Sequence, residues 1–197
     1  IDTYSAIRLR NELNLDIEDI IVGFVGRFHP VKGHLYLIEA LEIVKKRGLS
    51  IKCLLVGNKI NWNNQKLAKS LEEKSLKDDF LLLDKRLDIP AIMNTIDLHV
   101  LPSTTEAFPN VLCEAMACGT PCVSTDVGDA AFIIGQTGWI VPSKSSGALA
   151  ESIMLALLEK NESPHKWSAR KIQSRQRVKE LFDIDFMISK YYKCWTK

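Results

Sequence analysis

The stretch "IIVGFVGRFHPVKGHLYLIEALEIVKKRGLSIKCLLVG", residues 20–57, decides the fold. It opens with a short apolar, β-branched run that ends in glycine, which is typical of a buried strand. After a polar loop, apolar side chains recur at helical spacing, at Leu37, Ile38, Leu41 and Val44. Basic residues and a glycine then end the helix, and the apolar run at residues 51–57 predicts a second strand. The stretch therefore predicts a strand, a crossing helix and a second buried strand.

The same alternation continues to about residue 160. Further strands are predicted at residues 80–83, 97–102 and 121–125, and further helices at 62–74, 89–94, around Glu114 and at 147–160. "AFIIG" (131–135) and "GWIVP" (138–142) are interpreted as short extended pieces. Strands that alternate with helices in this way predict an α/β domain, a Rossmann-like doubly wound parallel sheet with helices on both faces.

We expect the chain to be organised in three parts. Residues 1–19 are interpreted as a linker and leading segment, 20–160 as the Rossmann-like domain, and 161–197 as a C-terminal helical tail that breaks near Asp183. The net charge of the chain is only +2, but residues 160–197 hold ten Lys/Arg and four Asp/Glu. A basic tail therefore follows a mildly acidic body.

Composition narrows the class of protein. Apolar residues make up 46% and charged residues 25%, the balance of a globular protein. No apolar run reaches the ~18 residues that are typical of a membrane span, and we expect no signal peptide. The five cysteines form no C-x-x-C pair, and we interpret them as reduced thiols of a cytoplasmic protein.

The loop "GRFHPVKG", residues 26–33, follows the first predicted strand. Doubly wound folds bind ligands beyond the carboxyl ends of their strands, so the residues of this loop are candidates for binding. Arg27 and Lys32 suit a polyanion such as a phosphate, and the helix N-terminus adds partial positive charge. The spacing matches neither a P-loop nor G-x-G-x-x-G, and a solvated basic loop is the alternative. We expect His29 and His34, which flank the loop, to be exposed.

The segment "STTEAFPNVLCEAMACGTP", residues 103–121, holds two carboxylates around a predicted helix start. Pro109 is predicted at the first helical position, so that free N–H groups follow Phe108. Glu106 lies just before this start, and Glu114 lies inside the helix, where its carboxylate is able to accept two vicinal hydroxyls such as those of ribose. The alternative is that Glu106 stabilises the helix dipole and Glu114 is simply solvated.

Taken together, these motifs resemble the C-terminal, donor-binding domain of family 4 glycosyltransferases, which are retaining enzymes of the GT-B architecture. The resemblance runs from about residue 20 to residue 158. It is carried by "GRFHPVKG", "LLVG", "LDIPAIMNTIDLHVLPSTTEAFPNVLCEAMACGTPCVSTDVG" and "GWIVP". Each motif alone is weak, and the ordered combination is specific.

The resemblance implies a role for each matching residue. Arg27 and Lys32 would hold the diphosphate of a nucleotide-sugar, and Glu106 would contact the donor sugar. These three residues are expected to serve catalysis by positioning the donor and stabilising charge on the leaving group. The implied donor-binding residues are Glu114 at the ribose, Arg86 and Leu87 at the base, and the backbone of Phe108, Pro109 and Asn110 at the sugar or distal phosphate. No bound metal or cofactor is expected, and the donor is a UDP- or GDP-sugar.

The resemblance also implies an activity. The full enzyme would move a hexose from a nucleoside diphosphate sugar to a glycan or lipid-linked acceptor with retention, in polysaccharide, lipopolysaccharide or capsule biosynthesis. In this family a second, N-terminal domain binds the acceptor, so we expect this chain to bind nucleotide without catalysing transfer. The alternatives are a non-catalytic nucleotide-sugar-binding or interaction module, and an epimerase or phosphorylase of the same architecture.

Three positions depart from the family pattern. Ala107 stands where glycine is usual, Asp129 replaces a second glycine, and Phe132 replaces a glutamate. These differences bear on how the two loops meet the donor.

The tail mixes basic and aromatic residues, and the resemblance implies that its last helix crosses to the N-terminal domain. Packing against protein is the first interpretation of the tail. Peripheral contact with the inner membrane surface comes second, and we expect no nucleic-acid partner.

Overall fold

The computed structural model describes residues 2–196 and contains a six-stranded sheet. The strands are β1 (Ile21–Val25), β2 (Lys52–Val56), β3 (Phe80–Leu82), β4 (Leu98–Leu101), β5 (Cys122–Thr125) and β6 (Trp139–Val141). Their order is β3-β2-β1-β4-β5-β6, and every neighbouring pair is parallel. The predicted doubly wound α/β fold is confirmed.

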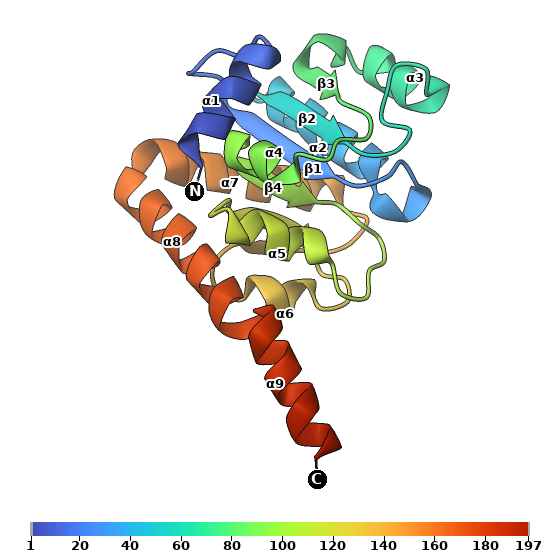
Figure 1. Cartoon of the computed structure of the whole chain (residues 1–197). Helices are drawn as coiled ribbons and strands as arrows, with labels where there is room; N and C mark the ends of the chain where they lie inside the picture. The colour runs from blue at the N-terminus through green and yellow to red at the C-terminus, as the bar shows by residue number, and fades with distance from the viewer. Residues whose placement is uncertain (1, 197) are drawn as a thin grey trace.

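Helices cover both faces of the sheet (Figure 1). They are α1 (Thr3–Glu12), α2 (His34–Lys46), α3 (Gln65–Glu73), α4 (Ile89–Thr95), α5 (Asn110–Ala117), α6 (Ala130–Ile134), α7 (Ser146–Glu162), α8 (Pro164–Leu181) and α9 (Ile184–Trp195), with short 3-10 turns η1 (Pro30–Lys32) and η2 (Lys77–Asp79). On one face α2 packs against α7 and α3, and on the other α4 packs against α1 and α5, which in turn contacts α6 and α8. Both sheet faces are thereby buried, which explains why the strands are predominantly apolar.

Two segments differ from the elements expected from the sequence. The predicted extended piece "AFIIG" is wrong, because these residues belong mostly to helix α6. Ala130, Ile133 and Ile134 are buried at helical spacing, and periodicity does not separate so short an apolar run from a strand. Residues 1–19, for which no element was assigned, contain α1, which begins after the capping carboxylate of Asp2 and buries Leu9.

A histidine lies in the core of the sheet. His99 in β4 is fully buried, and none of the described residues offers either ring nitrogen a hydrogen bond. Burial lowers the pKa of His99 to about 3. Burial also lowers the pKa of His34, at the start of α2, to about 4. Both side chains are therefore neutral in the folded protein at pH values where the unfolded chain binds protons.

We expect acid to destabilise the fold through these two histidines. The unfolded chain takes up their protons below about pH 6.5, while the folded pKa values are about 3 and about 4. Stability should therefore be fully present above pH 6.5 and should fall as the pH drops toward 4, by about 1.4 kcal/mol per pH unit for each histidine. Urea unfolding at pH 7.5 and 5.5 measures the difference.

Substitution separates the buried histidines from other titrating groups. His99→Leu should remove about 1.4 kcal/mol of the stability difference between the two pH values. His165→Gln is the matched control, because His165 is exposed on α8. An unchanged pH dependence in His99→Leu would contradict this account.

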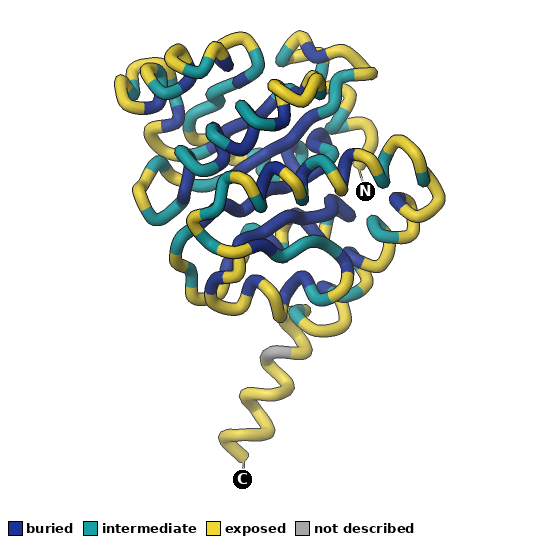
Figure 2. The backbone as a smooth tube through the Cα atoms, turned by 180° about the vertical axis from the view of Figure 1, so that it is seen from behind, coloured by how far each residue is buried: buried dark blue, intermediate teal, exposed yellow. Residues whose placement is uncertain are grey.

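The C-terminal tail divides into two helices of different surroundings. Arg170 of α8 forms two hydrogen bonds to Glu159, of 2.6 and 2.8 Å, and lies over the ring of Trp139 at 4.2 Å. Helix α9 begins after the predicted break at Asp183 and projects from the body of the domain, and its described side chains are exposed (Figures 1 and 2). Helix α8 therefore packs on the domain, as we expected for the whole tail, and α9 does not. Among residues 2–196, no helix is both long and apolar enough to cross a membrane.

Candidate functional site

The strand order reverses between β1 and β4. From β1 the chain moves outward through β2 and β3, and it returns to the other side of β1 to continue through β4, β5 and β6. The loops that follow β1 and β4 therefore meet at the carboxyl edge of the sheet, at the switch point where doubly wound folds bind ligands. The two sequence segments singled out above supply these two loops.

Backbone contacts join the two loops closely. The N–H of Thr104 donates to the carbonyl of Val31 at 2.7 Å. Gly33 has φ +69°, and a Cβ there would lie 1.9 Å from the carbonyl oxygen of Pro102. Both the left-handed conformation and the close approach require glycine at this position.

An ion pair connects the side chains of the two loops. Lys32 Nζ lies 2.7 Å from Glu106 Oε1, and the two side chains are 24% and 12% exposed. Ser103 Oγ donates to the same carboxylate oxygen at 2.7 Å. The second oxygen of Glu106 accepts no hydrogen bond from the described residues. From the sequence we expected both Lys32 and Glu106 to lie near a bound ligand. The sequence did not indicate that the two side chains pair with each other.

Two further charges at this edge lack partners within the described part of the chain. Arg27, two residues after the end of β1, is exposed and forms none of the ion pairs or side-chain hydrogen bonds found for residues 2–196. Glu114 is exposed on the second turn of α5 and is equally without an ion pair there. Both side chains are accessible to a ligand.

The start of α5 differs by one residue from the prediction. Pro109 is the capping residue and Asn110 is the first helical residue. The φ of Pro109, −76°, suits a helix, but its ψ of 86° does not, because the chain still turns there. The N–H of Asn110 donates to Phe108 O at 3.0 Å, and the side chain of Phe108 is 40% exposed.

Arg86, predicted at the base, is bound to two carboxylates of the protein. Its guanidinium donates two hydrogen bonds to Asp88, at 2.8 and 2.7 Å, and two to Glu12 of α1, at 2.6 and 3.5 Å. These carboxylates raise the pKa of Arg86, which in turn lowers the pKa of both acids. Arg86 therefore ties its loop to α1, and the adjacent Leu87, 90% exposed, remains accessible. The contact between Arg86 and Glu12 was not expected from the sequence, because the two residues are 74 positions apart.

The loop after β5 supports the loop after β4. Asp129 N donates to Ala107 O at 2.9 Å. Gly128 has φ +51°, and a Cβ there would lie 2.2 Å from the same carbonyl oxygen. Beneath them, Thr125 Oγ1 donates to Ser103 O at 2.6 Å. No signal in the sequence indicated that Thr125 and Ser103 support the site, because only the fold brings these two residues together.

His34 is not the exposed loop residue that we expected. It is buried at the start of α2, with ring centroids 4.8 Å from Phe24 and 5.1 Å from Phe28. The glycine before it turns the chain inward, so its ring enters the core. His29 is exposed, as predicted, and its Nδ1 accepts a hydrogen bond from Val31 N. Within residues 2–196, no three His, Cys, Asp or Glu side chains are grouped to hold a metal ion.

Comparison with known proteins agrees with this fold. The profile of the family "Glycosyl transferases group 1" matches residues 6–174. The chain belongs to this family and has its GT-B type of domain. The family resemblance found in the sequence is confirmed.

The chain is also similar to individual proteins that are named as glycosyltransferases. The chain is 35% identical over 107 residues, 54% of its length, to the putative glycosyltransferase EpsF of Bacillus subtilis. It is 29% identical over 147 residues, 69% of its length, to the capsular polysaccharide biosynthesis glycosyltransferase CapM of Staphylococcus aureus. The crystal structure of HepE from Anabaena, in complex with UDP, aligns with the whole chain at a TM-score of 0.84 and 25% identity.

The chain is shorter than these proteins. It covers 27% of EpsF, 36% of CapM and 53% of the HepE chain. The chain thus spans about half or less of the length of the proteins it matches.

Proposed function

We propose that this chain binds the nucleotide-sugar donor of a hexosyltransferase that transfers with retention of anomeric configuration. The observation that carries the proposal is the Lys32–Glu106 ion pair at the switch point between β1 and β4. It places a phosphate-binding cation and a hydroxyl-binding carboxylate next to one another, as a diphosphate joined to a sugar requires.

In the proposed complex the diphosphate takes Lys32 and Arg27 as its cationic partners. The free oxygen of Glu106 accepts a sugar hydroxyl while Ser103 holds the other oxygen. Glu114 accepts the ribose hydroxyls, and the base lies at the loop of Arg86 and Leu87. The backbone of the segment 108–110 faces the sugar or the distal phosphate. The proposed nucleotide is a uridine diphosphate, in keeping with the complex of HepE with UDP, and a guanosine diphosphate is the alternative.

The proposed reaction is a front-face displacement. The acceptor hydroxyl attacks the anomeric carbon on the side of the leaving diphosphate, the bond to the phosphate oxygen breaks, and that oxygen takes the acceptor's proton. Lys32 and Arg27 stabilise the negative charge that develops on the leaving group. The carboxylates bind and orient the donor, so catalysis rests on positioning and charge stabilisation.

The acceptor is proposed to bind to a further domain. The acceptor class is a glycan or a lipid-linked sugar, in keeping with the name of CapM. Helix α9 projects from the Rossmann-like domain (Figure 2). Its exposed side chains are available to pack on the further, acceptor-binding domain. The five free cysteines are consistent with a cytoplasmic enzyme.

We expect the 197-residue chain to bind UDP and not to transfer sugar. Calorimetry should give heat with UDP, and Glu114→Gln should weaken binding by about 10- to 100-fold, because a charge-assisted hydrogen bond contributes about 1.5–3 kcal/mol. Incubation with UDP-hexoses and a range of acceptors, followed by mass spectrometry, should give no glycoside product. Glu151→Gln, on the exposed side of α7, is the matched control.

Other outcomes identify the alternatives. Absence of heat with UDP, GDP and ADP would favour an interaction module. An altered sugar nucleotide without an acceptor would indicate an epimerase, and phosphate-dependent cleavage would indicate a phosphorylase. Transfer to an acceptor by the 197-residue chain would contradict the expected need for a further domain.

A further inference from the structure

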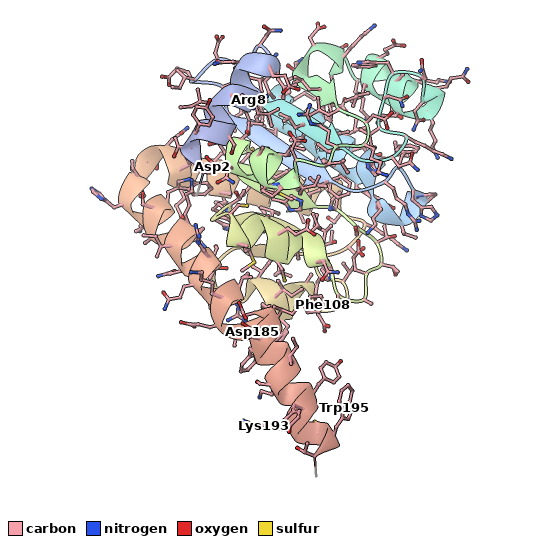
Figure 3. All side chains as sticks on the ribbon, in the orientation of Figure 1. Asp2, Arg8, Phe108, Asp185, Lys193 and Trp195 are labelled. Carbon is pink, nitrogen blue, oxygen red and sulfur yellow. The ribbon has the colours of Figure 1, made fainter. Side chains whose placement is uncertain are left out.

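Three phenylalanines join the candidate site to the C-terminal helices. Phe182, the residue that ends α8, packs edge-on against Phe108, with ring centroids 5.7 Å apart. It also packs edge-on against Phe132 of α6 at 5.6 Å. Figure 3 shows Phe108 beside the junction of α8 and α9, near the labelled Asp185.

Helix α8 also holds α6 through polar contacts. Arg177 Nε donates to Ile133 O at 2.9 Å, and its Nη2 donates to Phe132 O at 2.6 Å. A cation at these last carbonyls favours the helix end. Gly135 provides the space, because a Cβ there would lie 2.6 Å from the guanidinium carbon. The end of α6 and the end of α8 are therefore fixed to each other.

The other end of α6 holds the candidate site loop. Asp129, which precedes α6, donates its N–H to Ala107 O at 2.9 Å. The loop 106–109 is thus held on one side by Asp129 and on the other by the contact of Phe108 with Phe182. Both supports depend on α8, one through Arg177 and α6 and the other directly through Phe182.

The direction of α9 is set at the residue after Phe182. The side chain of Asp183 caps α9 by accepting from Asp185 N at 2.9 Å. Phe182 itself is half-buried and packs against the main core of the domain. It therefore lies between the exposed helix α9 and the loop that carries Glu106.

We propose that Phe182 is a positioning residue for the loop 106–109, through which the α8–α9 junction sets the affinity of the site for the donor. The affinity part rests on the proposed function, whereas the positioning part rests on the packing alone. Edge-on aromatic pairs contribute beyond simple burial, and two such pairs meet at this one ring.

Hydrogen exchange tests the positioning part without any ligand. Phe182→Ala should speed amide exchange at Thr104 and Asp129, whose N–H groups bond Val31 O and Ala107 O. The matched control is Trp167→Leu, which removes an aromatic contact with Trp139, at 6.4 Å, from the opposite end of α8. The control should leave both amides as protected as in the original chain. Equal exchange of the two amides in the two variants would overturn the proposal.

Calorimetry with UDP tests the affinity part. Phe182→Ala should raise the Kd for UDP about three- to tenfold, and Trp167→Leu should leave it unchanged. The double variant Phe108→Ala with Phe182→Ala should bind UDP with a Kd no higher than that of the weaker-binding single variant, because the two rings form one contact. If the original chain binds no nucleotide, the proposed function fails, and the exchange experiment still decides the role of Phe182. An unchanged Kd for UDP in Phe182→Ala would overturn the affinity part of the proposal and would leave the positioning part standing.

Discussion

Lys32→Met should weaken UDP binding by about 10- to 100-fold. The substitution keeps an unbranched side chain that is one atom shorter, and it removes the charge that we expect to meet the diphosphate, an interaction of about 1.5–3 kcal/mol. It also leaves the carboxylate of Glu106, now 2.7 Å from Lys32 Nζ, without its cation beside an incoming anion. Calorimetry at fixed ionic strength measures the change.

Two further variants make this result specific. Lys46→Met is the matched control, because Lys46 pairs with Glu42 at the far end of α2, the helix that begins just after Lys32, and should not affect UDP binding. Lys32→Met combined with Glu106→Gln should recover part of the lost affinity, because the unpaired carboxylate is gone. An unchanged Kd in Lys32→Met would show that phosphate binds elsewhere.

The second large effect concerns the fold of the site. Gly33→Ala should lower the free energy of unfolding by about 3 kcal/mol. An alanine in the left-handed region costs about 1–2 kcal/mol, and its Cβ would meet Pro102 O at 1.9 Å. Relief of this contact requires the loops to separate, which breaks the Thr104–Val31 hydrogen bond at a further cost of about 1 kcal/mol. Urea unfolding measures the loss.

Gly48→Ala separates the two contributions. Gly48 has φ +86°, but a Cβ there would meet nothing within 4 Å. Its substitution should therefore lose only about 1–2 kcal/mol. Equal losses in Gly33→Ala and Gly48→Ala would mean that the contact with Pro102 is not maintained.

Most of the fold could be predicted from the chain because its signals are local. The strands β1, β2 and β4 are predominantly apolar, and helix α2 carries regular apolar spacing. Helix α6 was missed because its five residues are too short for periodicity to separate helix from strand. Helix α1 was missed because only Leu9 of its residues is buried, so its apolar stripe is weak.

The candidate site was predicted as a set of residues and not as a set of contacts. The charge pattern identified Arg27, Lys32 and Glu106, but the pairing of Lys32 with Glu106 joins residues that are 74 positions apart. The attachment of Arg86 to Glu12 spans the same distance. Such contacts depend on strand order, which a pattern of local signals does not contain.

The backbone contacts between the loops after β1, β4 and β5 have a thermodynamic consequence. Thr104 bonds to Val31, Asp129 bonds to Ala107, and glycines allow the close approach at both junctions. The loops are thus ordered before a ligand arrives, and little conformational entropy of the backbone is lost on binding. What remains to be ordered are a few exposed side chains, chiefly Arg27 and Glu114. The candidate site is in this sense preorganised, and we expect its affinity for the proposed donor to depend on charge and shape rather than on folding around the ligand.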